Sequence, residues 1–156
     1  MLPDDLLKTA NELAESSRGK PRRSNLRRAT STAYYALFHT LARSCADLMV
    51  GGPGSERSKP AWNQVYRALD HGTARSACLN AVLIRKFPRE IQDFANVFVQ
   101  MQKKRHMADY DPDHRPYKSE VLNDIATVKS AIADFSRAPT KDRRAFAALV
   151  LFKSRP

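Results

Sequence analysis

The chain has 156 residues, of which 42% are hydrophobic and 28% are charged, and its formal net charge at pH 7 is +11. This length allows one domain with a buried core, and the longest apolar stretch, residues 145–152, is too short for the ~20 residues that cross a bilayer. Cys45 and Cys78 lack the spacing of a metal site or a disulfide framework. We therefore expect a cytoplasmic protein with reduced cysteines, no membrane contact, and no metal or other cofactor.

Glycine and proline divide the sequence into segments whose apolar residues have helical rather than alternating spacing. The predicted helices span residues 3–17, 22–49, 60–70, 73–86, 88–109, 117–137 and 140–153. No segment shows a convincing strand pattern, and no linker is long enough to divide the chain. The sequence therefore predicts a single all-α domain over residues 1–156. The basic amphipathic segment 140–153 is expected to dock on the other helices or on a sister subunit.

The helix predicted over residues 22–49 has two different faces. Its apolar stripe contains Leu26, Ala29, Ala33, Leu37, Leu41 and Leu48, widened by Tyr34, Phe38 and Cys45. The opposite face carries Arg28, Thr32, Tyr35, His39 and Arg43. Tyr35 and His39 are amphipathic side chains, which are favoured on half-covered surfaces. That face fits either a partner-binding or catalytic role or simple packing against a neighbouring helix.

The helix predicted over residues 88–109 has an apolar stripe that ends in charge. The stripe consists of Ile91, Phe94, Ala95, Phe98 and Met101. Arg105 and Asp109 continue it, whereas His106 and Tyr110 lie on its flank. A surface ion pair with the base before the acid contributes at best ~0.2–0.5 kcal/mol. Arg105 and Asp109 are therefore better explained by tertiary or subunit contacts.

The basic residues are clustered, which favours a polyanionic partner such as RNA or a nucleotide. The clusters are Arg18, Lys20, Arg22, Arg23, Arg27 and Arg28; then Lys103, Lys104 and Arg105; then Lys141, Arg143 and Arg144.

Two motifs carry a family resemblance. The segment LRRATSTAYYALFHTLAR, residues 26–43, resembles the signature helix of HEPN-domain proteins, in which Arg, Ala-Tyr-Tyr-Ala and Phe-His occur in this order. The segment RHMADYDP, residues 105–112, resembles the second HEPN signature in the branch that reads Arg and then Ala-Asp-Tyr-Asp. The resemblance implies an antiparallel bundle of four to five helices with extra short helices, commonly a homodimer with a basic cleft between its protomers.

The resemblance also implies a function in RNA metabolism. Many HEPN proteins are metal-independent endoribonucleases of toxin–antitoxin or defence systems, and some pair with a nucleotidyltransferase-type antitoxin. Others are inactive nucleotide-binding, RNA-binding or dimerising modules. Transferred to this sequence, the catalytic candidates are Arg105, His39, His106 and His114. The candidates for RNA or nucleotide binding, or for an interface, are Arg28, Tyr35, Arg43, Lys104, Asp109 and Tyr110.

The histidine spacing of this sequence departs from the catalytic HEPN pattern of Arg, four to six residues, then His. His106 directly follows Arg105, His114 comes after eight intervening residues, and Arg67 and His71 have only three residues between them. Two hypotheses therefore remain open: a metal-independent endoribonuclease that uses a substitute histidine, and a non-catalytic binding or scaffold module.

Overall fold

The computed structural model describes residues 2–16 and 22–155, which form eight helices and no strand. The helices are α1 (Leu2–Glu15), α2 (Arg23–Met49), α3 (Lys59–Ala68), α4 (His71–Leu79), α5 (Ala81–Ile84), α6 (Arg89–Tyr110), α7 (Lys118–Arg137) and α8 (Thr140–Leu151). The prediction of an all-α helical bundle is confirmed. Arg18 and Lys20 of the first basic cluster, and the last residue of the predicted helix 3–17, lie outside the described residues.

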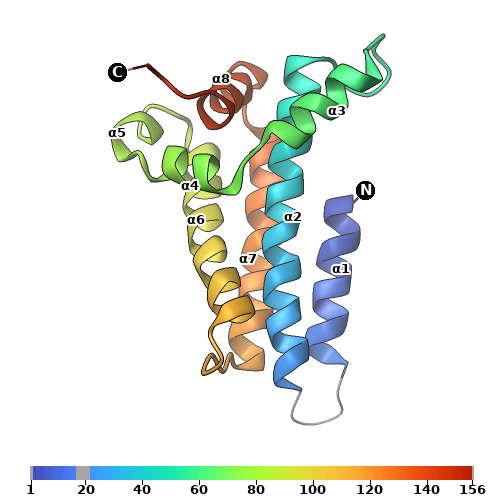
Figure 1. The fold of residues 1–156 in the computed structure, drawn as a ribbon, viewed down its shortest axis with the longest axis vertical. Helices are drawn as coiled ribbons and strands as arrows, with labels where there is room; N and C mark the ends of the chain where they lie inside the picture. The colour runs from blue at the N-terminus through green and yellow to red at the C-terminus, as the bar shows by residue number, and fades with distance from the viewer. Residues whose placement is uncertain (1, 17–21, 156) are drawn as a thin grey trace.

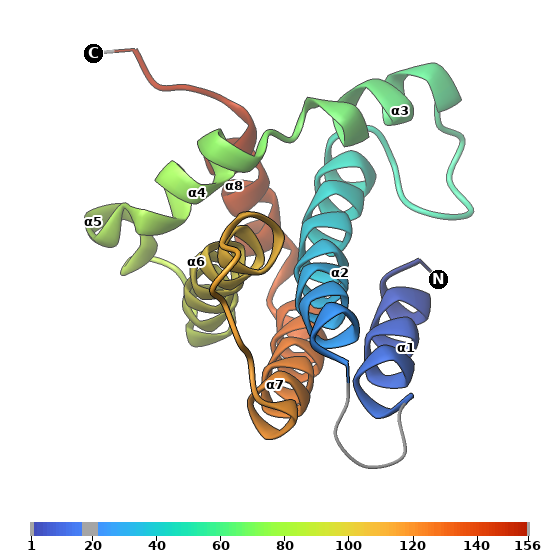
Figure 2. The ribbon, with the colours of Figure 1, turned by 60° about the horizontal axis from the view of Figure 1, so that its bottom comes forward.

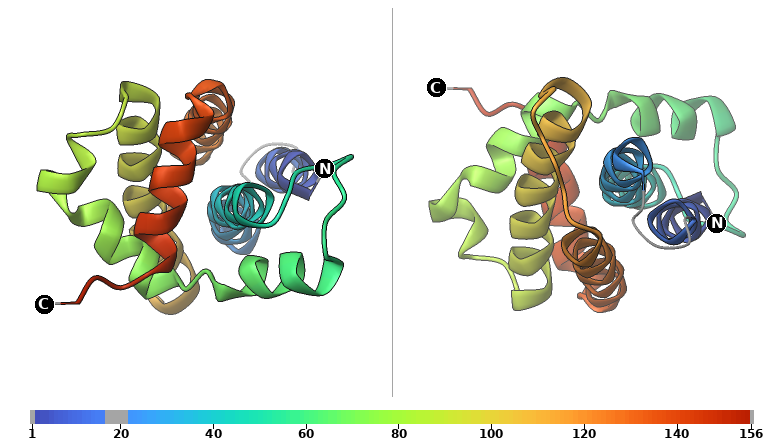
Figure 3. Two further views of the ribbon diagram at one scale, coloured as in Figure 1. Left: turned by 90° about the horizontal axis from the view of Figure 1, so that it is seen from above. Right: turned by 90° about the horizontal axis from the view of Figure 1, so that it is seen from below.

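The four long helices α1, α2, α6 and α7 run side by side, and α3, α4, α5 and α8 gather at one end of them (Figure 1). The pairs α1–α2 and α6–α7 are antiparallel, as expected for helices joined by short connections. Helix α2 is the central element, because it packs against α1, α6, α7, α3 and α8. Seen from above and below, α8 lies across one end, whereas the α6–α7 connection lies at the other (Figure 3).

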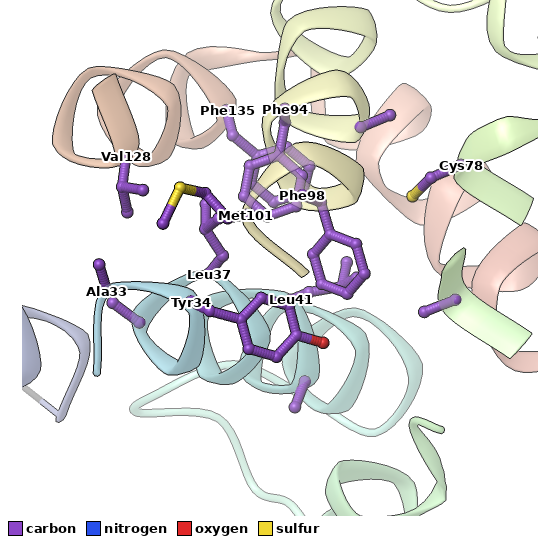
Figure 4. Packing of buried hydrophobic residues seen from close by; sticks show 14 of the residues in the cluster. Ala33, Tyr34, Leu37, Leu41, Cys78, Phe94, Phe98, Met101, Val128 and Phe135 are labelled. Carbon is purple, nitrogen blue, oxygen red and sulfur yellow. The ribbon is translucent and has the colours of Figure 1, made fainter. Parts of the chain in front are cut away.

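The apolar stripes predicted on the two longest helices, α2 and α6, form the core between them. Ile91, Phe94 and Phe98 of α6 are fully buried, as are Ala33 and Leu37 of α2. Figure 4 shows Phe94, Phe98 and Met101 facing Leu37 and Tyr34 across the interface. The ring of Tyr34 belongs to this core, while its hydroxyl group lies at the edge of the cluster. Tyr34 can therefore serve both packing and polar contacts.

Helix α8 packs on the bundle through Phe146, which is fully buried. The ring centre of Phe146 lies 5.7 Å from that of Phe87, 6.4 Å from that of Phe94 and 6.0 Å from that of Phe135. This cluster joins α8 to α6, α7 and the segment before α6. This packing explains why one face of the amphipathic segment 140–153 is apolar.

The predicted helix 73–86 is wrong at both its start and its middle. Helix α4 begins at His71, because the Asp70 side chain accepts a hydrogen bond from the Thr73 N–H at 2.8 Å and caps the first turn. Gly72 lies inside this turn rather than between helices. The chain then breaks at Asn80, whose side chain accepts from the Leu83 N–H and starts α5.

Cys45 and Cys78 are buried free thiols. Burial raises the pKa of each thiol to about 12, so neither is a thiolate at neutral pH. Within the described ranges, no helix combines the length and apolarity that a membrane span requires.

Candidate functional site

Arg105 extends from α6 onto the polar face of α2. Its Nη2 atom donates a hydrogen bond to Tyr35 Oη at 2.9 Å. The guanidinium carbon lies 5.4 Å from the ring centre of Tyr35 and 5.8 Å from that of Tyr34, within the range of cation–π attraction. Only 18% of the Arg105 side chain is exposed. The cation is therefore fixed between two helices instead of extending freely into solvent.

Asp109 holds Arg105 from the other side and ties α6 to α2. Arg105 Nε lies 3.0 Å from Asp109 Oδ2. That Nε atom is buried and has no aligned hydrogen bond, so we describe the pair as an ion-pair contact. The Ser31 hydroxyl of α2 donates a hydrogen bond to the other carboxylate oxygen of Asp109. Arg105 and Asp109 thus make the tertiary contacts that their place on the core stripe suggested.

His39 lies one turn after Tyr35 on the same face of α2. Its Nδ1 atom is hydrogen-bonded to Tyr66 Oη of α3, and the two rings are stacked with centres 5.8 Å apart. Burial lowers the pKa of His39. Burial raises the pKa of Tyr66, an effect that the positive charge of Arg43 opposes. His39 is therefore held as a neutral imidazole beside a protonated phenol at pH 7.

His71, which the sequence analysis did not select, belongs to the same site. Its Nδ1 atom lies 2.7 Å from Tyr34 Oη, and its ring is stacked on Phe38 with centres 4.0 Å apart. Gln102 Nε2 of α6 donates to the His71 carbonyl at 3.0 Å. Burial lowers the pKa of His71, and the charge of Arg105 lowers it further. His71 is thus a second neutral imidazole near the partly exposed Arg105 cation.

One signal in the sequence could have placed His71. Aspartate is a favoured N-cap residue, so Asp70 marks a possible helix start. That signal would have put His71 at the first helical position. Taking Gly72 as a chain break concealed it.

These contacts define an arginine–histidine cluster that draws on α2, α3, α4 and α6. Its members are Tyr34, Tyr35, His39, Tyr66, His71 and Arg105. The ring of Tyr35 links the two imidazoles, since its centre lies 6.2 Å from that of His39 and 6.1 Å from that of His71. All members except Tyr34 are partly exposed. The cluster can therefore present a positive charge and two neutral imidazole rings to a ligand on this face.

Several predicted site residues lie apart from this cluster. His106 and Tyr110 are exposed on α6, with ring centres 4.9 Å apart. His114 lies in the connection between α6 and α7, where its carbonyl accepts hydrogen bonds from Arg27. Arg28 is exposed on α2. Over residues 2–16 and 22–155, no hydrogen bond, ion pair or ring contact joins His106 or His114 to the cluster.

Lys104 and Arg43 also point to other partners. The Lys104 ammonium group lies 2.8 Å from Asp124 Oδ1 and 3.5 Å from Glu120 Oε1, so it ties α6 to α7. Burial by itself would lower the pKa of Lys104, but the hydrogen bonds and negative charges of Asp124 and Glu120 together raise it. Arg43 Nε lies 3.9 Å from Asp47 Oδ2. Lys104 therefore contributes to the bundle, and Arg43 lines a separate pocket.

Comparisons of the chain with models of protein families, with curated proteins and with solved structures find no match. In the part of the chain that the structure describes, no three His, Cys, Asp or Glu side chains are grouped so that they could hold a metal ion.

Proposed function

We propose that this protein is a HEPN-type homodimer that binds RNA over the arginine–histidine cluster and cleaves it without a metal ion, in a toxin–antitoxin or defence system. One observation carries this proposal: Arg105 is fixed within a few ångströms of Tyr35, on a partly exposed face that also presents two neutral imidazoles. The net charge of +11 supports a polyanionic substrate.

The cluster contains the groups that metal-free RNA cleavage requires. A neutral imidazole, His39 or His71, removes the proton from a 2′-hydroxyl group. The 2′-oxygen then attacks the phosphorus atom, the bond to O5′ breaks, and a 2′,3′-cyclic phosphate forms. The imidazolium formed in the first step returns that proton to O5′ as the leaving group departs. Arg105 stabilises the negative charge that develops on the phosphate oxygens.

Cleavage of a mixture of tRNA and mRNA in the presence of EDTA tests this proposal. The variants are Arg105→Ala, His39→Ala and His71→Ala, each checked for folding by circular dichroism. The matched control is His106→Ala, because His106 adjoins Arg105 in sequence but is exposed outside the cluster. We expect wild type and control to cut RNA and the three cluster variants to lose activity. A folded wild type that leaves RNA intact would refute the catalytic part.

A non-catalytic RNA-binding or nucleotide-binding scaffold is the second candidate. It is favoured by the Asp109 carboxylate, which pairs with Arg105 and so reduces the charge available to a phosphate group. In this case RNA or a nucleotide would bind without turnover, and the chain could pair with a nucleotidyltransferase-type antitoxin. Fluorescence anisotropy with labelled RNA at several salt concentrations distinguishes the two, since phosphate contacts make binding strongly salt-dependent.

The proposed homodimer pairs the partly exposed faces of α2 around Tyr35 and His39, so that the two clusters line a cleft between the protomers. Side chains of this amphipathic kind are enriched in protein interfaces. Light scattering during size-exclusion chromatography should give a mass near twice 17.6 kDa. Tyr35→Glu should shift the protein towards the monomer, because it places a charge in the contact. A monomeric wild type would contradict this part of the proposal.

A further inference from the structure

A pocket of about 440 Å³ lies between the start of α1, the second half of α2, the end of α7 and the start of α8. The loop after α2 closes one side through Gly52 and Pro53. Helix α1 lies beside only part of α2, and α8 crosses above (Figures 1 and 3). Tyr35, His39, His71 and Arg105 are not among the lining residues. The pocket is therefore separate from the arginine–histidine cluster.

The floor of the pocket is apolar and its volume is that of a small-molecule site. Leu48, Ile132 and Phe135 contribute apolar surface from α2 and α7. Small-molecule sites typically occupy about 300–1,000 Å³ and combine an apolar lining with a few polar groups. This volume is large enough for a single aromatic or nucleoside-sized body.

Positive charge exceeds negative charge around the pocket. Three arginines line it, Arg43, Arg143 and Arg144, against two acids, Asp4 and Asp47. Within the described residues, neither Arg143 nor Arg144 forms an ion pair. Arg143 donates only to neutral acceptors, the Ala138 carbonyl and the Thr140 hydroxyl group.

Asp47 does not neutralise the pocket, because its carboxylate is already engaged. Its Oδ1 atom accepts hydrogen bonds from Arg57 at 3.0 Å and from the Trp62 indole N–H at 2.9 Å. Arg43 Nε is 3.9 Å from the other oxygen, a longer and weaker contact. Arg43 thus retains capacity for an anionic ligand.

Ser44 provides a second polar group in the pocket wall. Its hydroxyl oxygen is buried and, among the described residues, has no hydrogen-bond partner. Buried polar atoms normally have partners. The neighbouring Thr40 satisfies its own hydroxyl by donating to the Ala36 carbonyl at 2.7 Å. Rotation about the Ser44 Cα–Cβ bond would present its hydroxyl group to a bound ligand.

We propose that this pocket binds a small organic anion, with an aromatic body resting on Leu48, Ile132 and Phe135 and one phosphate or carboxylate group held by Arg43 and Arg144. The apolar floor recognises the body, and the unneutralised guanidinium groups recognise the anionic group. This site does not depend on the proposed RNA chemistry, since no residue of the arginine–histidine cluster lines the pocket.

Isothermal titration calorimetry at low salt tests the site with three probes. Adenosine monophosphate carries the phosphate, 1-naphthoate carries the carboxylate, and adenosine is the uncharged comparison. We expect at least one of the two anions to bind and adenosine to bind more weakly. Binding of only one anion identifies which anionic group the pocket prefers. Absence of binding by both anions would overturn the proposal.

Variants locate the binding. Arg144→Gln should weaken the anion that binds by about tenfold, as expected for loss of one charge-assisted hydrogen bond. Leu48→Trp should abolish binding by filling the pocket. Arg89→Gln is the matched control, because Arg89 has an 86% exposed side chain and does not line the pocket. If the anion binds Arg144→Gln and Leu48→Trp as tightly as wild type, it binds elsewhere and the proposed location is refuted.

Discussion

Arg27 holds together the end of α6 and the connection to α7, although its sequence context is a basic cluster. Its guanidinium group donates to three backbone carbonyls: that of Ala108 at 3.2 Å, that of His114 at 2.8 Å, and that of Asp111. The start of α2 and this connection lie at the same end of the bundle (Figure 2). The last carbonyls of a helix have no partner within it, so Arg27 satisfies groups that would otherwise need water.

The loss of folding stability expected for Arg27→Ala can be calculated from these contacts. A hydrogen bond to a charged group contributes about 1.5–3 kcal/mol to stability. The site is only half buried, so water can replace part of what three carbonyls lose. We therefore expect a total loss of about 2–3 kcal/mol rather than the sum of the separate bonds. For a chain of this length that corresponds to a melting temperature lower by about 4–12 °C.

Urea unfolding followed by circular dichroism measures this loss. Arg28→Ala is the matched control, since Arg28 is the next residue, equally charged but exposed; its stability should change by less than about 0.5 kcal/mol. Arg27→Lys should give an intermediate loss, because one ammonium group cannot reproduce the planar fork of donors. Equal unfolding midpoints for Arg27→Ala and Arg28→Ala would refute the structural role of Arg27.

Three further results are expected. Burial lowers the pKa of His39 and His71 in the folded chain; the unfolded chain then binds more protons below about pH 6.5, so stability should fall from pH 7.5 to 5.5. The change in urea midpoint over this pH range should be smaller in His71→Gln than in wild type. An equal change in the two proteins would show that His71 does not contribute to this pH dependence. Lys104→Gln should cost about 1–2 kcal/mol, because Asp124 is 9% exposed and loses its cation; a loss of RNA binding at unchanged stability would instead assign Lys104 to the ligand. Phe146→Ala should cost about 3–5 kcal/mol through the cavity it leaves, and calorimetry that shows a melting temperature close to that of wild type would contradict the packing of α8.

The sequence by itself determined the all-α class, most of the helices and the core faces of α2 and α6. The spacing of Ile91, Phe94 and Phe98 placed the core side of α6, because apolar residues three and four positions apart lie on one side of a helix. The same argument showed that Arg105 and Asp109 continue a buried stripe. The sequence pattern placed the ends of the helices less well than their buried faces. The boundary at Asn80 depends on a side-chain cap that periodicity does not reveal.

Only the tertiary structure decided which polar groups meet. His71 joins Tyr34 across 37 positions of sequence, and Arg105 joins Tyr35 across 70. The spacing of residues along one helix carries no information about such pairs, which depend on how separate helices cross. For the same reason Lys104 and Arg27, both members of basic clusters, proved to be bound to acceptors on other segments. A sequence specifies the charge of a side chain, whereas packing specifies whether that charge faces solvent, a carboxylate or a backbone carbonyl.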